Sequence, residues 1–175
     1  MDAFKGLLGS HTNYLAHVAL NNCVDYFDLI AEQKAKNQDQ TLDRYKRLRY
    51  FLNAMESMNN VPEYFFHEFK SDLGWKDGEM GNILGEIRAK HPVLRDIEQI
   101  TNAYKHSVRR SANDFHAKDL QSPTLEFLAD SEGGAKVTFS FDSIEDEDMM
   151  GEAFRFWHAY HQDPDRNTLV PECKT

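Results

Sequence analysis

The sequence predicts a mainly α-helical protein: a bundle of about four principal helices with additional short helices, and one β-hairpin inserted before the last long helix. Apolar residues recur at three- and four-residue steps over most of the chain, which is the period of an amphipathic helix. Only residues 123–142 alternate apolar and polar side chains, as half-buried strands do. The length of 175 residues and the apolar fraction of 41% fit one domain that spans residues 1–175.

The N-terminal half of the chain is expected to form two long helices. The first is capped near Ser10 or Thr12 and ends near residue 35. The second begins at Thr41 and ends at Asn59-Asn60, because Pro62 favours the start of a new, short aromatic helix. The buried face of the second helix is expected to contain six residues at helical steps: Leu42, Tyr45, Leu48, Leu52, Met55 and Met58.

The middle of the chain is expected to form two helices that meet at Pro92. Trp75 plugs a loop bounded by glycines, and a helix follows from Met80 to His91. This helix ends there because a proline disfavours the α conformation of the residue before it. Since proline is accepted in the first turn of a helix, a central helix is expected from Pro92 to Arg110.

The C-terminal third is expected to contain the hairpin and the last long helix. Two alternating runs flank Gly133-Gly134, and they should lie on the bundle because an isolated hairpin is marginal in water. The hairpin side chains expected to be buried there are Phe127, Phe139 and Phe141. Ser143 and Asp146 form a capping arrangement for the last helix. Its apolar stripe is Met149, Ala153, Phe156 and Tyr160, and the tail, residues 165–175, is expected to be loose.

The charge of the chain is uneven. A formal charge of −9 argues against a general polyanion-binding protein, since affinity for phosphates comes from clustered Lys and Arg. Over residues 88–118, however, seven cations stand against three acids, which gives this stretch a local charge of +4. Two interpretations remain open for it: a solvated helix with local salt bridges, or a local anion site.

Two features of the sequence bear on the cellular compartment: the spacing of the cysteines and the lack of a long apolar run. Cys23 and Cys173 match no disulfide or zinc spacing, which fits a reducing environment, and Cys23 is interpreted as an inert packed thiol. The N-terminus has no unbroken apolar core, and no run reaches the ~18–20 apolar residues of a membrane helix. The sequence therefore predicts a cytoplasmic protein without membrane contact.

The central helix has two unlike faces. At about 100° per residue, five apolar residues fall in one sector and form the expected core face: Val93, Ile97, Ile100, Tyr104 and Val108. Five hydrogen-bonding residues lie on the opposite side: Arg95, Gln99, Asn102, His106 and Arg109. In a monomer these residues form a solvent-facing stripe. A functional site requires that the stripe line a cleft, most simply one that is shared with a second copy of the chain.

Residues 100–110, ITNAYKHSVRR, with the preceding EIRAKHPVLRDIEQ, resemble the core motif of HEPN-domain proteins. These are small helical-bundle domains that often dimerise, and many are metal-independent endoribonucleases of defence and toxin–antitoxin systems. Their usual motif is an Arg, a polar residue that is commonly Asn, three further residues and a His. Asn102 and His106 match the Asn-x-x-x-His part, whereas Thr101 stands where the motif has Arg.

The resemblance implies an RNA-associated homodimer, and the missing Arg implies a degenerate or inactive ribonuclease-type domain unless another cation binds the scissile phosphate. If the site cuts RNA, it does so as a metal-independent endoribonuclease without a cofactor. His106 is then the general acid or base for attack by the 2′-OH, because imidazole titrates near neutral pH, and Asn102 orients the His106 ring or the phosphate. The substrate-binding cations are Arg95, Lys105, Arg109 and Arg110. RNA, a second copy and a protein such as an antitoxin are the implied partners.

Two alternatives stand beside this interpretation. His158 and His161 form an i, i+3 pair close to Asp163 and Asp165, and such a pair can bind a metal ion from one helix face. No second cluster completes the coordination shell, so surface histidines are the simpler interpretation and no metal is predicted. The alternative function is a non-catalytic protein-interaction module, whose polar stripe lies in solvent or in a dimer contact.

Overall fold

In the computed structural model of the chain, the residues described are 9–36, 41–108, 124–129, 135–141 and 144–171. For residues 36, 41–44, 103–108, 124–129, 135–141 and 144 the description covers the backbone alone. The elements in chain order are α1 (His11–Tyr14), the π-helical η1 (Leu15–Ala19), α2 (Leu20–Lys36), α3 (Thr41–Phe69), the 3-10 helical η2 (Asp77–Glu79), α4 (Met80–Lys90), α5 (Pro92–Val108), β1 (Thr124–Ala129), β2 (Ala135–Phe141), β3 (Ile144–Glu145), α6 (Asp146–Gln162) and α7 (Arg166–Leu169).

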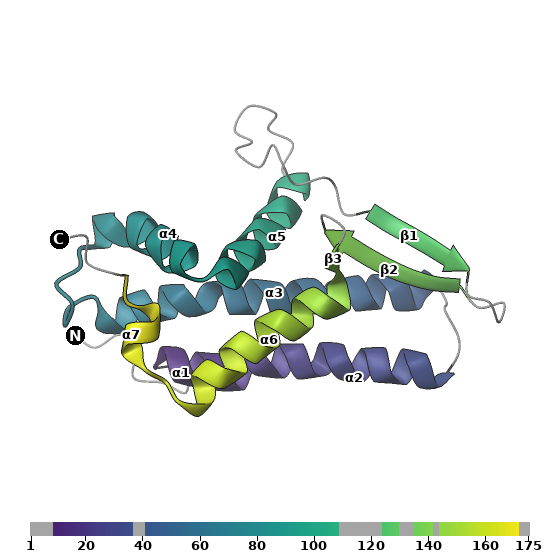
Figure 1. Cartoon of the computed structure of the whole chain (residues 1–175), viewed down its shortest axis with the longest axis horizontal. Helices are drawn as coiled ribbons and strands as arrows, with labels where there is room; N and C mark the ends of the chain where they lie inside the picture. Colours follow the sequence, from purple (N-terminus) through teal and green to yellow (C-terminus); the bar gives the residue numbers. More distant parts are fainter. Residues whose placement is uncertain (1–8, 37–40, 109–123, 130–134, 142–143, 172–175) are drawn as a thin grey trace.

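The helices form a bundle, as the sequence predicts (Figure 1). α2 and α3 lie side by side and run in opposite directions, and α6 crosses and contacts both. α4 and α5 form a V that packs on α3. The core between these helices is rich in aromatic side chains, of which Phe51, Phe65, Phe66 and Trp157 are fully buried.

The first predicted helix is present as α1, η1 and α2, which follow one another without a break. The predicted cap at Ser10 is confirmed, because its hydroxyl oxygen accepts a 3.1 Å hydrogen bond from the backbone N–H of Asn13. The apolar stripe of this helix faces the core, and Leu15, Ala19 and Tyr26 are fully buried.

The predicted end of the second helix at Asn59-Asn60 is wrong, because α3 continues through Pro62. A proline inside a helix removes one backbone hydrogen bond and crowds the preceding turn. Phe65 and Phe66 lie just beyond it and are fully buried in the core, so tertiary packing outweighs this local cost. Asn59 lies within the helix, and its Oδ1 accepts a 3.2 Å hydrogen bond from Nη2 of Arg88.

The predicted buried face of α3 is only partly correct. Met55 and Met58 are fully buried, as predicted, and Leu48 and Leu52 are half-buried. Tyr45 is exposed, and the side chain of Leu42 lies outside the description. Arg47 and Phe51 are buried on this side of the helix. The face is rotated relative to the prediction because Arg47 has a buried carboxylate partner, and its burial turns Tyr45 outward.

The middle of the chain agrees with the prediction. His91 has an extended backbone (φ −124°, ψ 99°) that ends α4, and α5 begins at Pro92. Trp75 is half-buried and stacks on Phe66 with ring centroids 5.6 Å apart and an interplanar angle of 8°. The glycine before it, Gly74, has φ +71°, a conformation that side chains with a Cβ rarely adopt.

The range predicted to form a hairpin, residues 123–142, contains β1 and β2. These strands pair antiparallel, from Thr124 opposite Ser140 to Ala129 opposite Ala135. β2 also pairs with β3, which leads directly into α6, so the sheet order is β1-β2-β3. The strand side chains lie outside the description, and the expected burial of Phe127, Phe139 and Phe141 therefore stays a prediction.

The last long helix is correctly predicted except for its start. The residue before α6 is Glu145, which makes no side-chain capping bond, and Ser143 lies outside the described residues. Asp146 does not serve as a cap because its carboxylate binds an arginine of α3. The predicted apolar stripe faces the core, with Met149, Ala153 and Tyr160 buried and Phe156 half-buried.

The prediction of a loose tail is wrong for residues 165–171. α7 forms there, and its Leu169 is fully buried. Two residues at the corner between α4 and α5 hold α7 through its carbonyl groups. Nζ of Lys90 donates to the carbonyl oxygens of Asn167 and Val170 at 2.8 and 3.1 Å, and Nε2 of His91 lies 2.6 Å from that of Thr168. Residues 172–175 lie outside the described part of the chain.

Candidate functional site

Helix α5 presents one face to the core, as the central-helix pattern predicts. Val93, Ile97 and Ile100 are 8%, 0% and 2% exposed. Leu94 is 2% exposed and widens the buried face beyond the predicted sector. Tyr104 and Val108 belong to the α5 backbone, but their side chains lie outside the description. The opposite side of α5 is therefore fixed toward the outside of the bundle.

The predicted polar stripe begins on this outer side. The side chains of Arg95 and Gln99 are exposed, and Asn102 is half-buried at the edge of the stripe. Nε of Arg95 lies 3.9 Å from a carboxylate oxygen of Asp96, and the arginine side chain remains 60% exposed. An exposed ion pair of this length is worth little, so the guanidinium remains available to an anionic ligand.

The positions of the remaining predicted site side chains relative to these three lie outside the description. The backbones of Lys105 and His106 belong to α5, but their side chains are among those not described. Arg109 and Arg110 lie outside the described residues altogether. Helical geometry places His106 one turn beyond Asn102, and this spacing is the part of the predicted site that the α5 backbone supplies.

Thr101, the residue at which the resemblance to HEPN domains leads one to expect an Arg, faces the core rather than the stripe. It is 2% exposed, and its hydroxyl donates a 2.9 Å hydrogen bond to the carbonyl oxygen of Ile97, one turn earlier. A buried hydroxyl that is satisfied within its own helix has no contact to offer a phosphate. This chain therefore has no cation at the motif position and no polar group there that reaches the outer face.

Part of the positive charge near α5 is used inside the fold. Arg88 is 9% exposed, and its Nη1 lies 3.0 Å from the Glu98 carboxylate while its Nη2 binds Asn59. Lys90 donates to two carbonyl groups at the end of α7. These two cations therefore bind groups within the protein rather than contribute to an anion site. Arg95 is the cation of the predicted site whose described side chain remains open to solvent.

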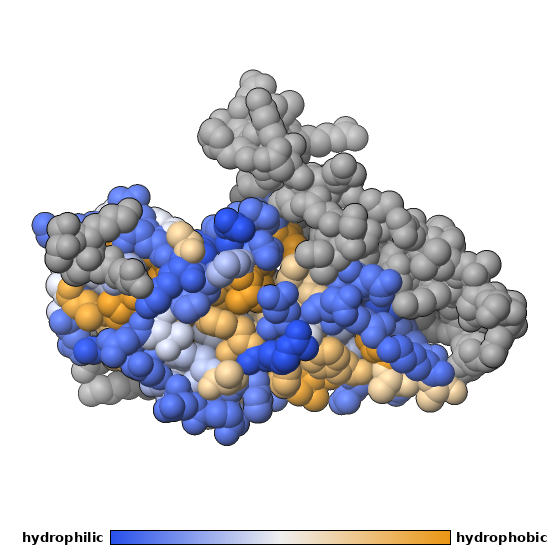
Figure 2. All heavy atoms as spheres, viewed as in Figure 1, coloured by the Kyte–Doolittle hydropathy of each residue, from blue (hydrophilic) through white to orange (hydrophobic). Residues whose placement is uncertain are grey.

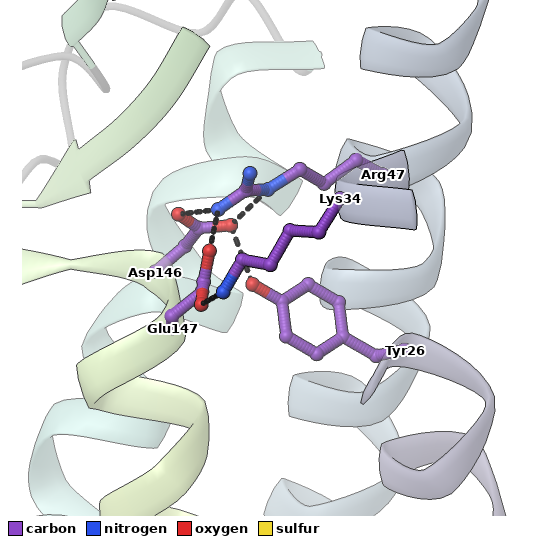
Figure 3. A network of polar contacts seen from close by, with 5 residues as sticks. All are labelled: Tyr26, Lys34, Arg47, Asp146 and Glu147. Carbon is purple, nitrogen blue, oxygen red and sulfur yellow. Dashed lines mark hydrogen bonds and ion pairs between the residues drawn. The ribbon is translucent and has the colours of Figure 1, made fainter. Parts of the chain in front are cut away.

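A buried ion pair joins the start of α6 to α2 and α3 (Figure 3). Asp146 is fully buried and binds Arg47 through both carboxylate oxygens, with Nη2–Oδ1 at 2.6 Å and Nε–Oδ2 at 2.7 Å. The Tyr26 hydroxyl donates to Oδ2 at 2.6 Å. At the outer edge, Glu147 accepts from Arg47 at 3.3 Å and from Lys34 at 2.8 Å. Both Asp146 oxygens are occupied, so this network is a structural clamp rather than a substrate site.

A second polar network lies at the other end of α3 and α6. His11 is 4% exposed; its Nδ1 lies 2.7 Å from a carboxylate oxygen of Glu68, and its Nε2 lies 2.8 Å from the hydroxyl oxygen of Tyr160. Carboxylate, imidazole and hydroxyl follow one another as in catalytic triads. However, His11 and Tyr160 are each only 4% exposed, and the backbone N–H of His11 donates to the same Glu68 oxygen as its ring, so the three groups bind one another rather than a ligand. The network therefore fixes α1 against α3 and α6.

Other chemically notable side chains have structural surroundings. Burial raises the pKa of the Cys23 thiol to about 12, and its Sγ lies 3.5 Å from the Met58 sulfur. The prediction that Cys23 is a packed thiol is thus confirmed, and its inertness stays a prediction. His158 is exposed and stacks on Phe154, whereas His161 is half-buried. In the described part of the chain, no group of three or more His, Cys, Asp or Glu side chains is placed to hold a metal ion.

Comparisons of the chain with protein-family models, curated proteins and solved structures found no match. Among the helices of the described residues, none is both long and apolar enough to cross a membrane. Of the predicted site, the described side chains are those of Arg95 and Gln99, which are exposed on the outer face of α5, and of Asn102, which is half-buried at its edge.

Proposed function

We propose that this protein is an RNA-associated domain of the HEPN type, which binds RNA along the outer face of α5 and does not cut it by the usual HEPN mechanism. One observation carries the proposal: α5 buries its apolar face and leaves Arg95 and Gln99 exposed beside Asn102. A guanidinium and two amides at one-turn steps match the donors that bind RNA phosphates and bases. His106 continues this series by its position in α5.

The position of Thr101 is the reason to propose binding rather than cleavage. In the HEPN family the Arg at this position is expected to stabilise the scissile phosphate, and charge stabilisation is a large part of catalysis. Here the position carries a hydroxyl that is 2% exposed and bonded to the helix backbone. Arg95 lies almost two turns away on the other side of α5, where it serves to bind RNA rather than to replace that guanidinium.

The proposal includes a cytoplasmic homodimer in which two α5 helices line one basic cleft, with RNA and an antitoxin-like protein as partners. The chain as a whole carries −9, so a single copy repels a polyanion over most of its surface. Pairing two outer faces doubles the number of cations that contact one RNA, and affinity rises with each phosphate neutralised. This is the physical reason to expect that the binding form is a dimer.

The test is incubation of the purified full chain and its His106→Ala variant with mixed RNA, without added metal. Binding is measured by gel shift and cleavage by denaturing electrophoresis. We expect that both proteins bind RNA and that neither cuts it. Cleavage by the parent protein alone would show that His106 is catalytic and refute the non-cutting part of the proposal.

A charge-reversal pair tests the location of the binding surface. Arg95→Glu places a negative charge on the outer face of α5 and is expected to weaken RNA binding and its salt dependence. Arg155→Glu is the matched control, because Arg155 is an exposed arginine on α6. Equal effects of the two substitutions would mean that only the overall charge matters, and absence of RNA binding by the parent protein would refute the proposal.

One surface favours the alternative, a protein-interaction module. Val24 on α2 is 44% exposed, and half-buried Phe27 contacts Phe154 of α6 edge-on at 5.6 Å. Figure 2 shows hydrophobic surface over α2 beside its crossing with α6. Exposed apolar patches of this kind often mark protein contacts. Light scattering of the parent protein and Val24→Glu distinguishes the two functions: an assembly that Val24→Glu disrupts, in a protein that binds no RNA, favours the module.

A further inference from the structure

We propose that the outer side of the first part of α3 is a second binding surface, specific for single-stranded RNA, and call it the α3 patch: Tyr45, Lys46, Arg49 and Tyr50. The inference rests on the proposed RNA association and adds a ligand class and a surface on another helix. Residues 41–50, TLDRYKRLRY, interleave four cations with two tyrosines. Basic residues interleaved with aromatic ones are typical of proteins that bind single strands.

The α3 patch faces outward because the other side of α3 is anchored in the core. Arg47 is 8% exposed and Phe51 is fully buried. At 100° per residue, Tyr45 and Arg49 point away from these two positions. Tyr45 is 69% exposed, which makes it the more exposed of the two large apolar side chains that are open to water within the described residues, the other being Val24 at 44%. A tyrosine ring held in solvent offers a flat face for another ring to stack on.

The cations of the α3 patch surround its second tyrosine. Nζ of Lys46 lies 5.8 Å from the centroid of the Tyr50 ring, and the guanidinium carbon of Arg49 lies 5.4 Å from it. The neighbouring Arg47 is already neutralised by Asp146. Among the residues with described side chains, no carboxylate pairs with Lys46 or Arg49. Their two charges are therefore available to neutralise phosphates.

This chemistry favours a single strand over other polyanions. A single strand exposes the faces of its bases, which stack on tyrosine, while its phosphates meet the adjacent cations. A duplex hides its base faces and would leave Tyr45 without a role. An anionic membrane would use the cations alone, so its affinity would not depend on the Tyr45 ring. The ring of Tyr45 thus distinguishes the proposed ligand from the alternatives.

The experiment measures fluorescence anisotropy of a labelled, mixed-sequence single-stranded RNA with the full-length protein. Tyr45→Ala is expected to weaken binding about tenfold, because one base stack contributes roughly 1–3 kcal/mol and 1.4 kcal/mol is tenfold. Tyr45→Phe keeps the ring and should bind like the parent protein. The double variant Lys46→Glu/Arg49→Glu should also lower the slope of affinity against salt, by roughly 0.7 per lost phosphate contact. Arg155→Glu is the charge control, and unchanged thermal unfolding confirms the fold of each variant.

The results separate this inference from the proposed function. The α3 patch is refuted, and the α5 proposal stands, if the parent protein binds RNA, Arg95→Glu weakens this binding, and all α3 patch variants bind as tightly as the parent protein. If the α3 patch variants lose affinity and Arg95→Glu does not, the α5 surface is refuted and the α3 patch stands. The assignment to single-stranded RNA would be overturned if the α3 patch variants lost affinity for duplex RNA, single-stranded DNA or anionic vesicles to the same extent as for single-stranded RNA. A parent protein that binds no RNA would refute both.

Discussion

The substitution Asp146→Asn tests whether the buried ion pair holds α6 on the bundle. Asparagine keeps the shape of the side chain but removes the charge that compensates Arg47, whose side chain is 10% exposed. Removing one partner of a buried pair costs about 3–5 kcal/mol, because the other charge stays buried. Glu147 lies 3.3 Å from Arg47 and retains part of the compensation. We therefore expect a loss near the lower end, about 3 kcal/mol of unfolding free energy.

Urea unfolding followed by circular dichroism measures this loss. With a slope of roughly 2 kcal/mol per molar urea, the midpoint should fall by about 1.5 M without a change of slope. Asp148→Asn is the control, since Asp148 is exposed in the same turn and should change stability by less than about 0.5 kcal/mol. The reasoning is refuted if Asp146→Asn costs as much in an Arg47→Met background as in the parent protein, because the two residues would then not be coupled.

Three further predictions concern titration and packing. Burial and the adjacent carboxylate raise the pKa of the Tyr26 hydroxyl above its ordinary value of about 10, so its contribution is complete below pH 10 and is lost as the pH rises further. Urea unfolding at rising alkaline pH should show a decline of stability that is shallower in Tyr26→Phe by up to about 1.4 kcal/mol per pH unit. His11→Ala should cost about 2–4 kcal/mol in the same assay, because it leaves the buried Tyr160 hydroxyl without its partner and removes a side chain that is only 4% exposed, whereas exposed His17→Ala should be nearly neutral. In a Cys173→Ser variant, Cys23 should react with a thiol reagent at neutral pH only after denaturation, and immediate labelling of the folded protein would contradict its burial.

The helices and the two faces of α5 could be predicted because their causes are local. Apolar side chains such as Val93, Ile97 and Ile100 repeat with the helical period, and Pro92 marks a boundary through its effect on the residue before it. Pro62 is also a local signal, yet there the helix continues. The difference is that the residues after Pro62 are buried in the same core as those before it, and a local pattern does not contain this information.

The two polar networks could not be predicted because their partners are remote in sequence. Arg47 and Asp146 are 99 residues apart, and His11 and Tyr160 are 149 apart. The helical period of the apolar residues favours Tyr45 for the buried face of α3, and it carries no sign that Arg47 is buried by a carboxylate far along the chain. The outer face of α5 has the same limit: helical spacing predicts which polar side chains share that face, but it does not predict which other surface would pack against them.

The remoteness of these contacts also has a consequence for synthesis of the protein. Helix α6 supplies the partner of a buried group at each end of the bundle, Asp146 for Arg47 and Tyr160 for His11. As the chain leaves the ribosome, α2 and α3 can pair early, but the Asp146 carboxylate that binds Arg47 and the Tyr160 hydroxyl that binds His11 are absent until α6 emerges. The nascent protein therefore cannot reach its native core before α6 has been synthesised, and truncation anywhere before α6 should give a chain that chaperones retain or proteases remove.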